Sequence, residues 1–162
     1  MAKVAVIVLG NRRSGKSTTW NTLFGRTVRT GAEVRALALS DETEVPVFLV
    51  SGSPEERKEY VGKIVGDVEA RVVLCSLQYT DHARDTINYF IENGYGLYAQ
   101  WLNPGFDDQG PQLDTLGFVP YLLHRGATLS IRDGQVDPKA RVSEIREFLL
   151  GWASSRRLAM RA

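Results

Sequence analysis

The residues best suited to chemistry lie near the N-terminus, in the stretch Gly10-Asn11-Arg12-Arg13-Ser14-Gly15-Lys16-Ser17. Two glycines allow a tight backbone turn, so successive N–H groups can point at one anion. The lysine adds a mobile positive charge, and the last serine adds a hydroxyl oxygen that can bind a metal ion. This composition predicts a loop that binds a chain of phosphates.

The elements on either side of this loop are those needed to position it. Val4–Leu9 is an unbroken apolar run, which predicts a strand buried on both faces. Thr18–Phe24 has an apolar face and is followed by Gly25, which predicts a helix with a glycine cap. The start of such a helix offers unpaired N–H groups and the positive end of its dipole to a phosphate.

Strand, loop and helix thus follow one another in the order of the Walker A motif, G-x-x-x-x-G-K-[ST]. Residues 4–25 resemble the opening of P-loop NTPases, and Thr22–Gly25 is similar to the corresponding segment of many regulatory GTPases. The resemblance implies that Lys16 reaches the β- and γ-phosphates and that Ser17 binds Mg²⁺, with ATP or GTP as the nucleotide. The residues that it places against the nucleotide are Gly10, Asn11, Arg12, Arg13, Ser14, Gly15, Lys16, Ser17 and Thr18.

The rest of the chain predicts one α/β domain over residues 1–162, with three layers and a mainly parallel sheet. One strand is expected to be antiparallel, because the connection between Glu33–Leu39 and Val45–Val50 is too short for a crossover helix. This order of elements resembles a Ras-like GTPase domain. Further strands are predicted at Arg71–Leu77, Tyr95–Leu102 and Ala127–Ile131. Helices are predicted from Ser53 to Gly66, after Thr80 or Asp81, and from Asp137-Pro138 onward. One helical turn is predicted around Gln112–Leu116.

Other candidate residues lie where GTPase-like proteins place their switches and their base-reading loop. In the loop 26–31, Arg29 or Arg26 is a candidate arginine finger, and Thr30 or Thr27 a second hydroxyl ligand for Mg²⁺. Gln78, at the end of a strand, is a candidate for orienting water. Asn103, with Asp107 after it, is an imperfect match to the guanine-reading pattern N-K-x-D. The candidates for these roles that we rank first are Arg29, Gln78, Asn103 and Thr30.

The acid that normally helps to hold Mg²⁺ in such domains is missing from its expected places. The second hairpin strand ends in Ser51-Gly52-Ser53-Pro54, and the next buried strand ends in Ser76-Leu77-Gln78. The acids of the hairpin turn are expected at the far end of the hairpin, and Glu55 or Glu56 is a candidate for reaching the site through water. The residue that replaces this acid is left open. The hairpin-turn acids are Asp41, Glu42 and Glu44.

Composition limits the classes of partner. The net charge of +1 gives no global field that would favour nucleic acid, and no apolar stretch is long enough to span a membrane. The single cysteine, Cys75, excludes an internal disulfide, while His82 and His124 are isolated and predict no zinc site. An expected cytoplasmic location follows, where nucleotide and Mg²⁺ are available.

Three functions are compatible with these residues. The first is Mg²⁺-dependent binding of a nucleoside triphosphate, with hydrolysis that is slow or stimulated by a partner; the partner is another protein or a further copy of the chain in an oligomer. The second is a P-loop kinase, because Val72–Leu102 resembles small kinases and the long loop carries Asp107, Asp108 and Asp114 as candidate acceptor-site acids. The third is a nucleotide-binding interaction module without catalysis, which the missing acids favour.

Overall fold

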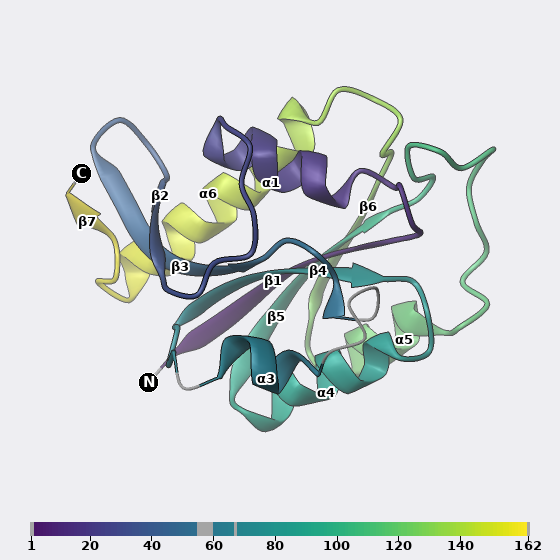
Figure 1. Ribbon diagram of the computed structural model, residues 1–162, viewed down its shortest axis with the longest axis horizontal. Helices are drawn as coiled ribbons and strands as arrows, with labels where there is room; N and C mark the ends of the chain where they lie inside the picture. The colour runs from purple at the N-terminus through teal and green to yellow at the C-terminus, as the bar shows by residue number, and fades with distance from the viewer. Residues whose placement is uncertain (1, 55–59, 67, 162) are drawn as a thin grey trace.

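The computed structural model describes residues 2–54, 60–66 and 68–161. Its strands form one sheet with helices on both sides (Figure 1). The strands are β1 (Lys3–Gly10), β2 (Arg35–Ala38), β3 (Thr43–Val50), β4 (Val72–Gln78), β5 (Tyr95–Leu102), β6 (Thr128–Arg132) and β7 (Met160–Arg161). The helices are α1 (Lys16–Phe24), α3 (Val61–Val65), α4 (Ala83–Glu92), α5 (Phe118–His124) and α6 (Lys139–Ser155).

The sheet is mainly parallel, and its order is β2-β3-β4-β1-β5-β6, with β7 paired to β3. β1 lies in the middle, parallel to β4 on one side and to β5 on the other. β2 runs antiparallel to β3, which confirms the predicted hairpin. The three-layer α/β/α class with a mainly parallel sheet is therefore confirmed. The hairpin strand β3 is separated from β1 by β4.

Both faces of the sheet are covered, which explains why β1 consists almost entirely of apolar residues. Val4, Val6 and Val8 belong to a cluster with buried residues of α1 and α6. The alternate residues of β1 belong to a second cluster with buried residues of α3, α4 and α5. Because successive side chains of a strand point to opposite faces, β1 contributes to both cores at once.

The carboxyl ends of the parallel strands meet along one edge of the sheet. Gly10 at the end of β1 is in register with Gln78 at the end of β4. On the other side, the ends of β5 and β6 are paired at Leu102 and Arg132. The loops that follow these strands therefore converge above one edge, where ligands of open α/β sheets bind.

Several predicted boundaries are corrected. A single helix from Ser53 to Gly66 is wrong, because Tyr60 has an extended backbone (φ −73°, ψ 131°) and α3 begins only at Val61; part of that prediction, residues 55–59, lies outside the described residues. The residue that precedes α4 is His82, without a side-chain cap, rather than Thr80 or Asp81. The helical turn expected around Gln112–Leu116 lies instead at α5, and β7 was not expected.

No helix in the described part of the chain combines the length and the apolar character needed to cross a membrane.

Candidate functional site

The loop between β1 and α1, residues 10–17, has the backbone shape that the glycines allow. Gly15 has a φ of 106°, and it precedes the first residue of α1. A side chain at this position would be strained by the backbone and would also meet the Arg141 guanidinium, since a Cβ would lie 3.3 Å from Nη2. Arg13 also has a positive φ, of 60°. The loop therefore enters α1 through two residues in the left-handed region of φ.

Some carbonyl groups of this loop accept hydrogen bonds from neighbouring segments. The Gly10 carbonyl accepts a hydrogen bond from the Tyr79 N–H (3.0 Å), and the Ser14 carbonyl accepts one from the Phe106 N–H (2.9 Å). The first N–H groups of an α-helix have no partner within the helix. In α1 these include the N–H groups of Ser17 and Thr18, and both residues line a cavity. The start of α1 therefore offers backbone N–H donors at the cavity.

Lys16 is the buried cation of this loop, with only 6% of its surface exposed. Its Nζ donates hydrogen bonds to the carbonyls of Gly10 (3.1 Å) and Asn11 (2.8 Å). Lys16 also lines the cavity, so a bound anion can take over as the partner of its ammonium group.

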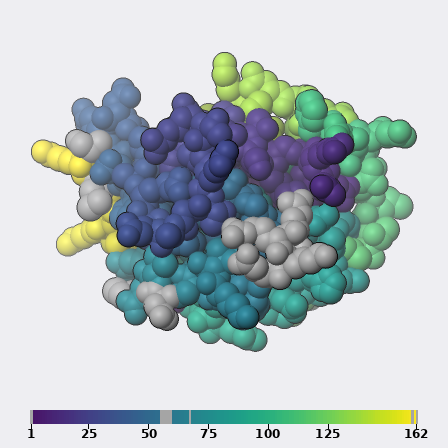
Figure 2. Space-filling view, in the orientation of Figure 1, coloured from purple at the N-terminus to yellow at the C-terminus, as the bar shows by residue number. Residues whose placement is uncertain are grey.

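The cavity has a volume of about 750 Å³, within the range of small-molecule sites. Four basic and two acidic side chains stand among its described lining residues, which favours an anionic ligand. Figure 2 shows α1 and its preceding loop, in purple, at the surface beside the green segment that follows β5. The lining residues are Arg12, Arg13, Ser14, Gly15, Lys16, Ser17 and Thr18 from the loop and α1; Ser51 after β3; Phe106 and Asp107 after β5; and Gly134, Gln135, Val136, Asp137, Pro138 and Arg141 after β6.

The segments after β5 and β6 support the 10–17 loop from its outer side. The Asn11 amide donates to both carboxylate oxygens of Asp108 (3.2 Å each), and the same carboxylate accepts the Gly105 N–H (2.8 Å). The Gly134 N–H donates to the Pro104 carbonyl (2.7 Å). Three chain segments that are far apart in sequence therefore fix one another at the edge of the sheet.

The structure brings seven of the predicted phosphate-binding residues to the cavity wall, namely residues 12–18. Gly10 and Asn11 are not among the lining residues, and their carbonyls hold Lys16. Gln78 is in register with Gly10 at the end of β4, and it too is not a lining residue. Its role in orienting water stays a prediction.

Two other candidates, Arg29 and Asn103, are not among the described residues that line the cavity. Arg29 is exposed outside the cavity lining, and its carbonyl accepts a hydrogen bond from Arg35. The Asn103 side chain exchanges two hydrogen bonds with the backbone of Gln112, at 2.8 and 2.6 Å. An amide held in this way has no edge directed at a base, so the structure gives the base-reading hypothesis for Asn103 no support.

Thr30 lies next to the cavity rather than on it. Its hydroxyl oxygen accepts hydrogen bonds from the N–H groups of Ser51 (2.9 Å) and Gly52 (3.5 Å). Since a hydroxyl oxygen has two lone pairs, both are occupied by the backbone. The hydroxyls of Ser17 and Ser51, in contrast, belong to residues of the cavity wall.

The side chains of the cavity wall fit a magnesium ion only if a phosphate ligand also supplies oxygen atoms to the ion. Among the described residues, no group of three or more His, Cys, Asp or Glu side chains is placed to hold a metal ion. Mg²⁺ commonly keeps several water ligands and binds through substrate phosphates with few protein groups. Ser17 and Ser51 are suited to supply such groups. Glu55 and Glu56 lie outside the described residues.

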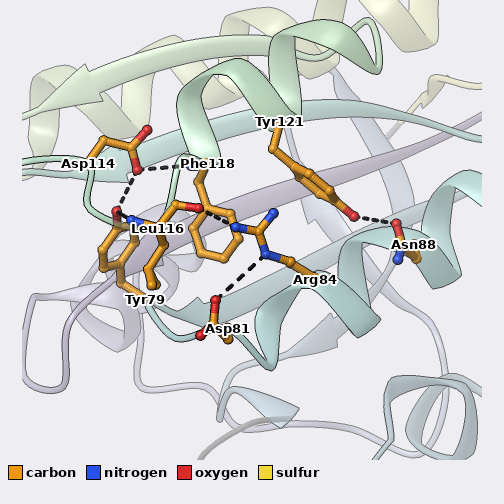
Figure 3. A network of polar contacts seen from close by, with 8 residues as sticks. All are labelled: Tyr79, Asp81, Arg84, Asn88, Asp114, Leu116, Phe118 and Tyr121. Atoms are coloured by element: carbon orange, nitrogen blue, oxygen red, sulfur yellow. Dashed lines mark hydrogen bonds and ion pairs between the residues drawn. The ribbon is translucent and has the colours of Figure 1, made fainter.

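Asp114, a candidate acceptor-site acid, is used in a structural network instead (Figure 3). Its carboxylate accepts hydrogen bonds from the Tyr79 hydroxyl (2.5 Å) and from the N–H groups of Phe118 (2.9 Å) and Val119 (2.7 Å). Burial raises the pKa of Asp114, but these hydrogen bonds outweigh burial and hold the pKa below its usual value. Asp114 thus anchors the start of α5 to β4.

An Asp114→Asn variant should lose stability at neutral pH, by about 1–3 kcal/mol, because it leaves buried donors with a poorer acceptor. The folded-state pKa is below the usual 3.8, so the carboxylate stabilises the fold above that pH and this stabilisation is lost as pH falls through the folded pKa. Urea titrations between pH 7 and pH 3 check this. The difference from wild type should shrink only below about pH 4. Asp41→Asn, in the exposed hairpin turn, serves as the control.

Sequence reasoning missed Ser51 as a lining residue and Arg141 as a buried one. Arg141 is only 3% exposed, and it stands one turn before the buried residues Ile145 and Leu149 on the same face of α6. An arginine within an apolar stripe was therefore the available signal. Ser51 offered a weaker signal, as the first polar residue after a buried strand.

No protein-family model, curated protein or solved structure matches this chain.

Proposed function

We propose that this protein binds a nucleoside triphosphate with Mg²⁺ through residues 12–18, and that it hydrolyses the nucleotide slowly or under the control of a protein partner. Because residues 10–17 resemble the Walker A motif, the chain would on this proposal be a P-loop NTPase. A cytoplasmic setting, where nucleotide and Mg²⁺ are abundant, is part of the proposal.

The proposal is supported by three features that occur together in one cavity. The predicted phosphate-binding residues 12–18 line it, Lys16 is buried in its wall, and basic side chains outnumber acidic ones among its described lining residues. Unpaired N–H groups at a helix start, a lysine and a surplus of positive charge each favour binding of phosphate. Here all three face the same space.

Different groups of the protein bind the phosphates and the metal ion. The N–H groups at the start of α1 bind phosphate oxygens, and Lys16 exchanges its carbonyl partners for them. Ser17 and Ser51 would hold Mg²⁺ through their hydroxyl oxygens, and the ion would supply positive charge against the phosphates. The two described acids that line the cavity, Asp107 and Asp137, come from the segments after β5 and β6, and neither belongs to the 10–17 loop or to α1. Slow intrinsic hydrolysis is consistent with that arrangement.

Replacing Lys16 with alanine should weaken binding of the triphosphate by about 10- to 100-fold. A hydrogen bond to a charged group contributes about 1.5–3 kcal/mol, and each 1.4 kcal/mol is tenfold in affinity. Calorimetric titration with ATP and with GTP, each with Mg²⁺, measures this loss and identifies the preferred base. Lys63→Ala is the matched control, since Lys63 is an exposed lysine on α3 and is absent from the cavity lining.

The proposal would be overturned if the wild-type protein bound nucleotide no more tightly than Lys16→Ala, or if the wild type bound neither nucleotide. Release of phosphate from the same samples then separates hydrolysis from binding alone. A protein that binds but releases no phosphate supports the interaction-module alternative or a switch that needs its partner.

Phosphoryl transfer to an acceptor is a second candidate, because Asp107 lines the same cavity as Lys16. A carboxylate facing the phosphate site is what a kinase uses to receive the acceptor's proton. Nucleotide consumption that begins only when an acceptor alcohol is added, and that is lost in Asp107→Asn, would favour this candidate over hydrolysis.

A further inference from the structure

Arg141 is a buried cation that forms no ion pair with any described residue. It is 3% exposed, on the first turn of α6. The described ion pairs, Arg84–Asp81 and Arg132–Glu144, do not include it. Its Nε is buried and has no hydrogen-bond partner among the described residues. Burial lowers the pKa of Arg141, while the charges of Asp133 and Asp137 oppose this effect.

Its two remaining nitrogens hold the guanidinium between α1 and the segment after β6. Nη2 donates to the Thr19 hydroxyl (3.3 Å), which itself donates to the Gly15 carbonyl (2.9 Å). Nη1 lies 3.5 Å from the Val136 carbonyl. Arg141 also lines the cavity, so the buried charge stands beside the proposed phosphate site. Burying an unpaired charge costs stability, and an anionic ligand is the partner that would offset this cost.

Strand order defines the two ends of the cavity. Ser51 follows β3 and residues 133–138 follow β6, and these strands lie on opposite sides of β1 in the sheet. The β6 side carries two exposed apolar side chains that line the cavity, Phe106 (64% exposed) and Val136 (59%). Exposed apolar surface suits a flat base, so the nucleoside belongs on this side. Arg141, on the first turn of α6 directly after this segment, lines the same cavity.

Building on the proposed function, we propose that Arg141 binds the phosphate group attached directly to the nucleoside, the α-phosphate. Lys16 then serves the terminal phosphates, and the two cations hold opposite ends of the chain. The role predicts that Arg141 contributes equally to the binding of a nucleoside triphosphate, diphosphate and monophosphate, and contributes nothing to the binding of the bare nucleoside.

The test replaces Arg141 with methionine, which has a similar length but no charge. Binding of ATP, ADP, AMP and adenosine (or of the guanosine series, if the wild type prefers it) is measured by calorimetry. Affinity for each of the three nucleotides should fall by about the same factor, roughly 10- to 100-fold, with no change for the nucleoside. The melting temperature without ligand should stay the same or rise, because a buried unpaired charge is removed.

Arg146→Met is the matched control. Arg146 is on the same helix and also ties α6 to α1, through the Leu23 carbonyl (2.8 Å), but it is not in the cavity lining. A purely structural Arg141 would lose unliganded stability on substitution and would weaken binding no more than Arg146→Met does. Loss confined to the triphosphate would also overturn the assignment, since it would place Arg141 at the γ-phosphate.

A second variant, Arg141→Gln, is used in case the methionine variant does not fold, because it keeps a polar side chain with N–H donors while removing the charge. It should give the same pattern of affinities. If wild-type protein binds no nucleotide, the proposed function itself fails. If wild type binds and Lys16→Ala does not, while both Arg141 variants bind like wild type, only the role of Arg141 fails.

Discussion

Replacing Gly134 with alanine is expected to lower the free energy of unfolding by about 2–3 kcal/mol and to weaken nucleotide binding roughly tenfold or more. Gly134 follows β6 and lies against the outer side of the 10–17 loop. A Cβ at this position would lie 2.6 Å from the Ser14 carbonyl oxygen and 3.1 Å from the Pro104 carbonyl oxygen. Both obstructing atoms belong to the backbone, so no side chain can rotate away.

The loss of affinity follows from the position of Ser14. Its carbonyl accepts the Phe106 N–H, and its side chain is buried next to Lys16, with Oγ 3.5 Å from Nζ. Pushing this carbonyl aside moves the loop that presents N–H groups to the cavity. The constraint is one of space, because Gly134 is not among the residues with positive φ.

Gly110→Ala is the control for this prediction, since Gly110 lies in the loop after β5 and a Cβ there would meet nothing within 4 Å. Urea denaturation gives the stability of both variants, and calorimetry with the preferred nucleotide gives the affinity. Equal behaviour of the two variants would show that the contact between the β6 segment and the 10–17 loop is unimportant for either property.

The sequence was sufficient for the centre of the fold because local and global preferences agree there. Val4–Leu9 is apolar throughout, and it forms a strand covered on both faces. Gly25 ends α1 in the left-handed conformation predicted for a glycine cap. The hairpin of β2 and β3 followed from the length of its connection. At each of these places a single physical rule decides the outcome.

Elements at the periphery depend on tertiary contacts that a sequence pattern does not contain. α5 has Pro120 as its third residue, where a missing N–H is harmless, and its start is fixed by Asp114, which is held in turn by Tyr79. β7 has only two residues and forms by pairing with β3. Neither the network nor the pairing can be read from local composition.

The candidate site also has one part that could be predicted from local sequence and another that depends on tertiary contacts. Residues 12–18 were predicted from a motif whose chemistry is local, because one short loop and one helix start supply most of the donors. The opposite wall comes from segments far along the chain, including Phe106, Val136 and Arg141, and its position depends on the strand order. Asn103 was selected by its place in the sequence, whereas its hydrogen bonds to Gln112 direct it elsewhere.

Trp20→Ala is expected to reduce the free energy of unfolding by about 3–5 kcal/mol, the range for removing a large aromatic side chain from a core. Trp20 has no exposed surface and belongs to the cluster between the sheet and the helices α1 and α6. Its indole Nε1 also donates a buried hydrogen bond to the Ser76 hydroxyl of β4 (2.8 Å). The substitution leaves a cavity and removes this donor together.

Two further variants separate the loss of the hydrogen bond from the loss of packing in Trp20→Ala. A binding measurement then relates Trp20 to the candidate site. Ser76→Ala removes only the acceptor and should cost about 1–3 kcal/mol, because the indole N–H is left buried and unpaired. Trp152→Ala, on α6 and only partly buried, should cost less than Trp20→Ala. Trp20 lies one turn after Lys16 in α1, so its contact with β4 fixes the helix that positions Lys16 and Ser17. Nucleotide affinity should therefore fall in Trp20→Ala under conditions where the variant is still folded, and unchanged affinity there would show that α1 is positioned by its loop alone.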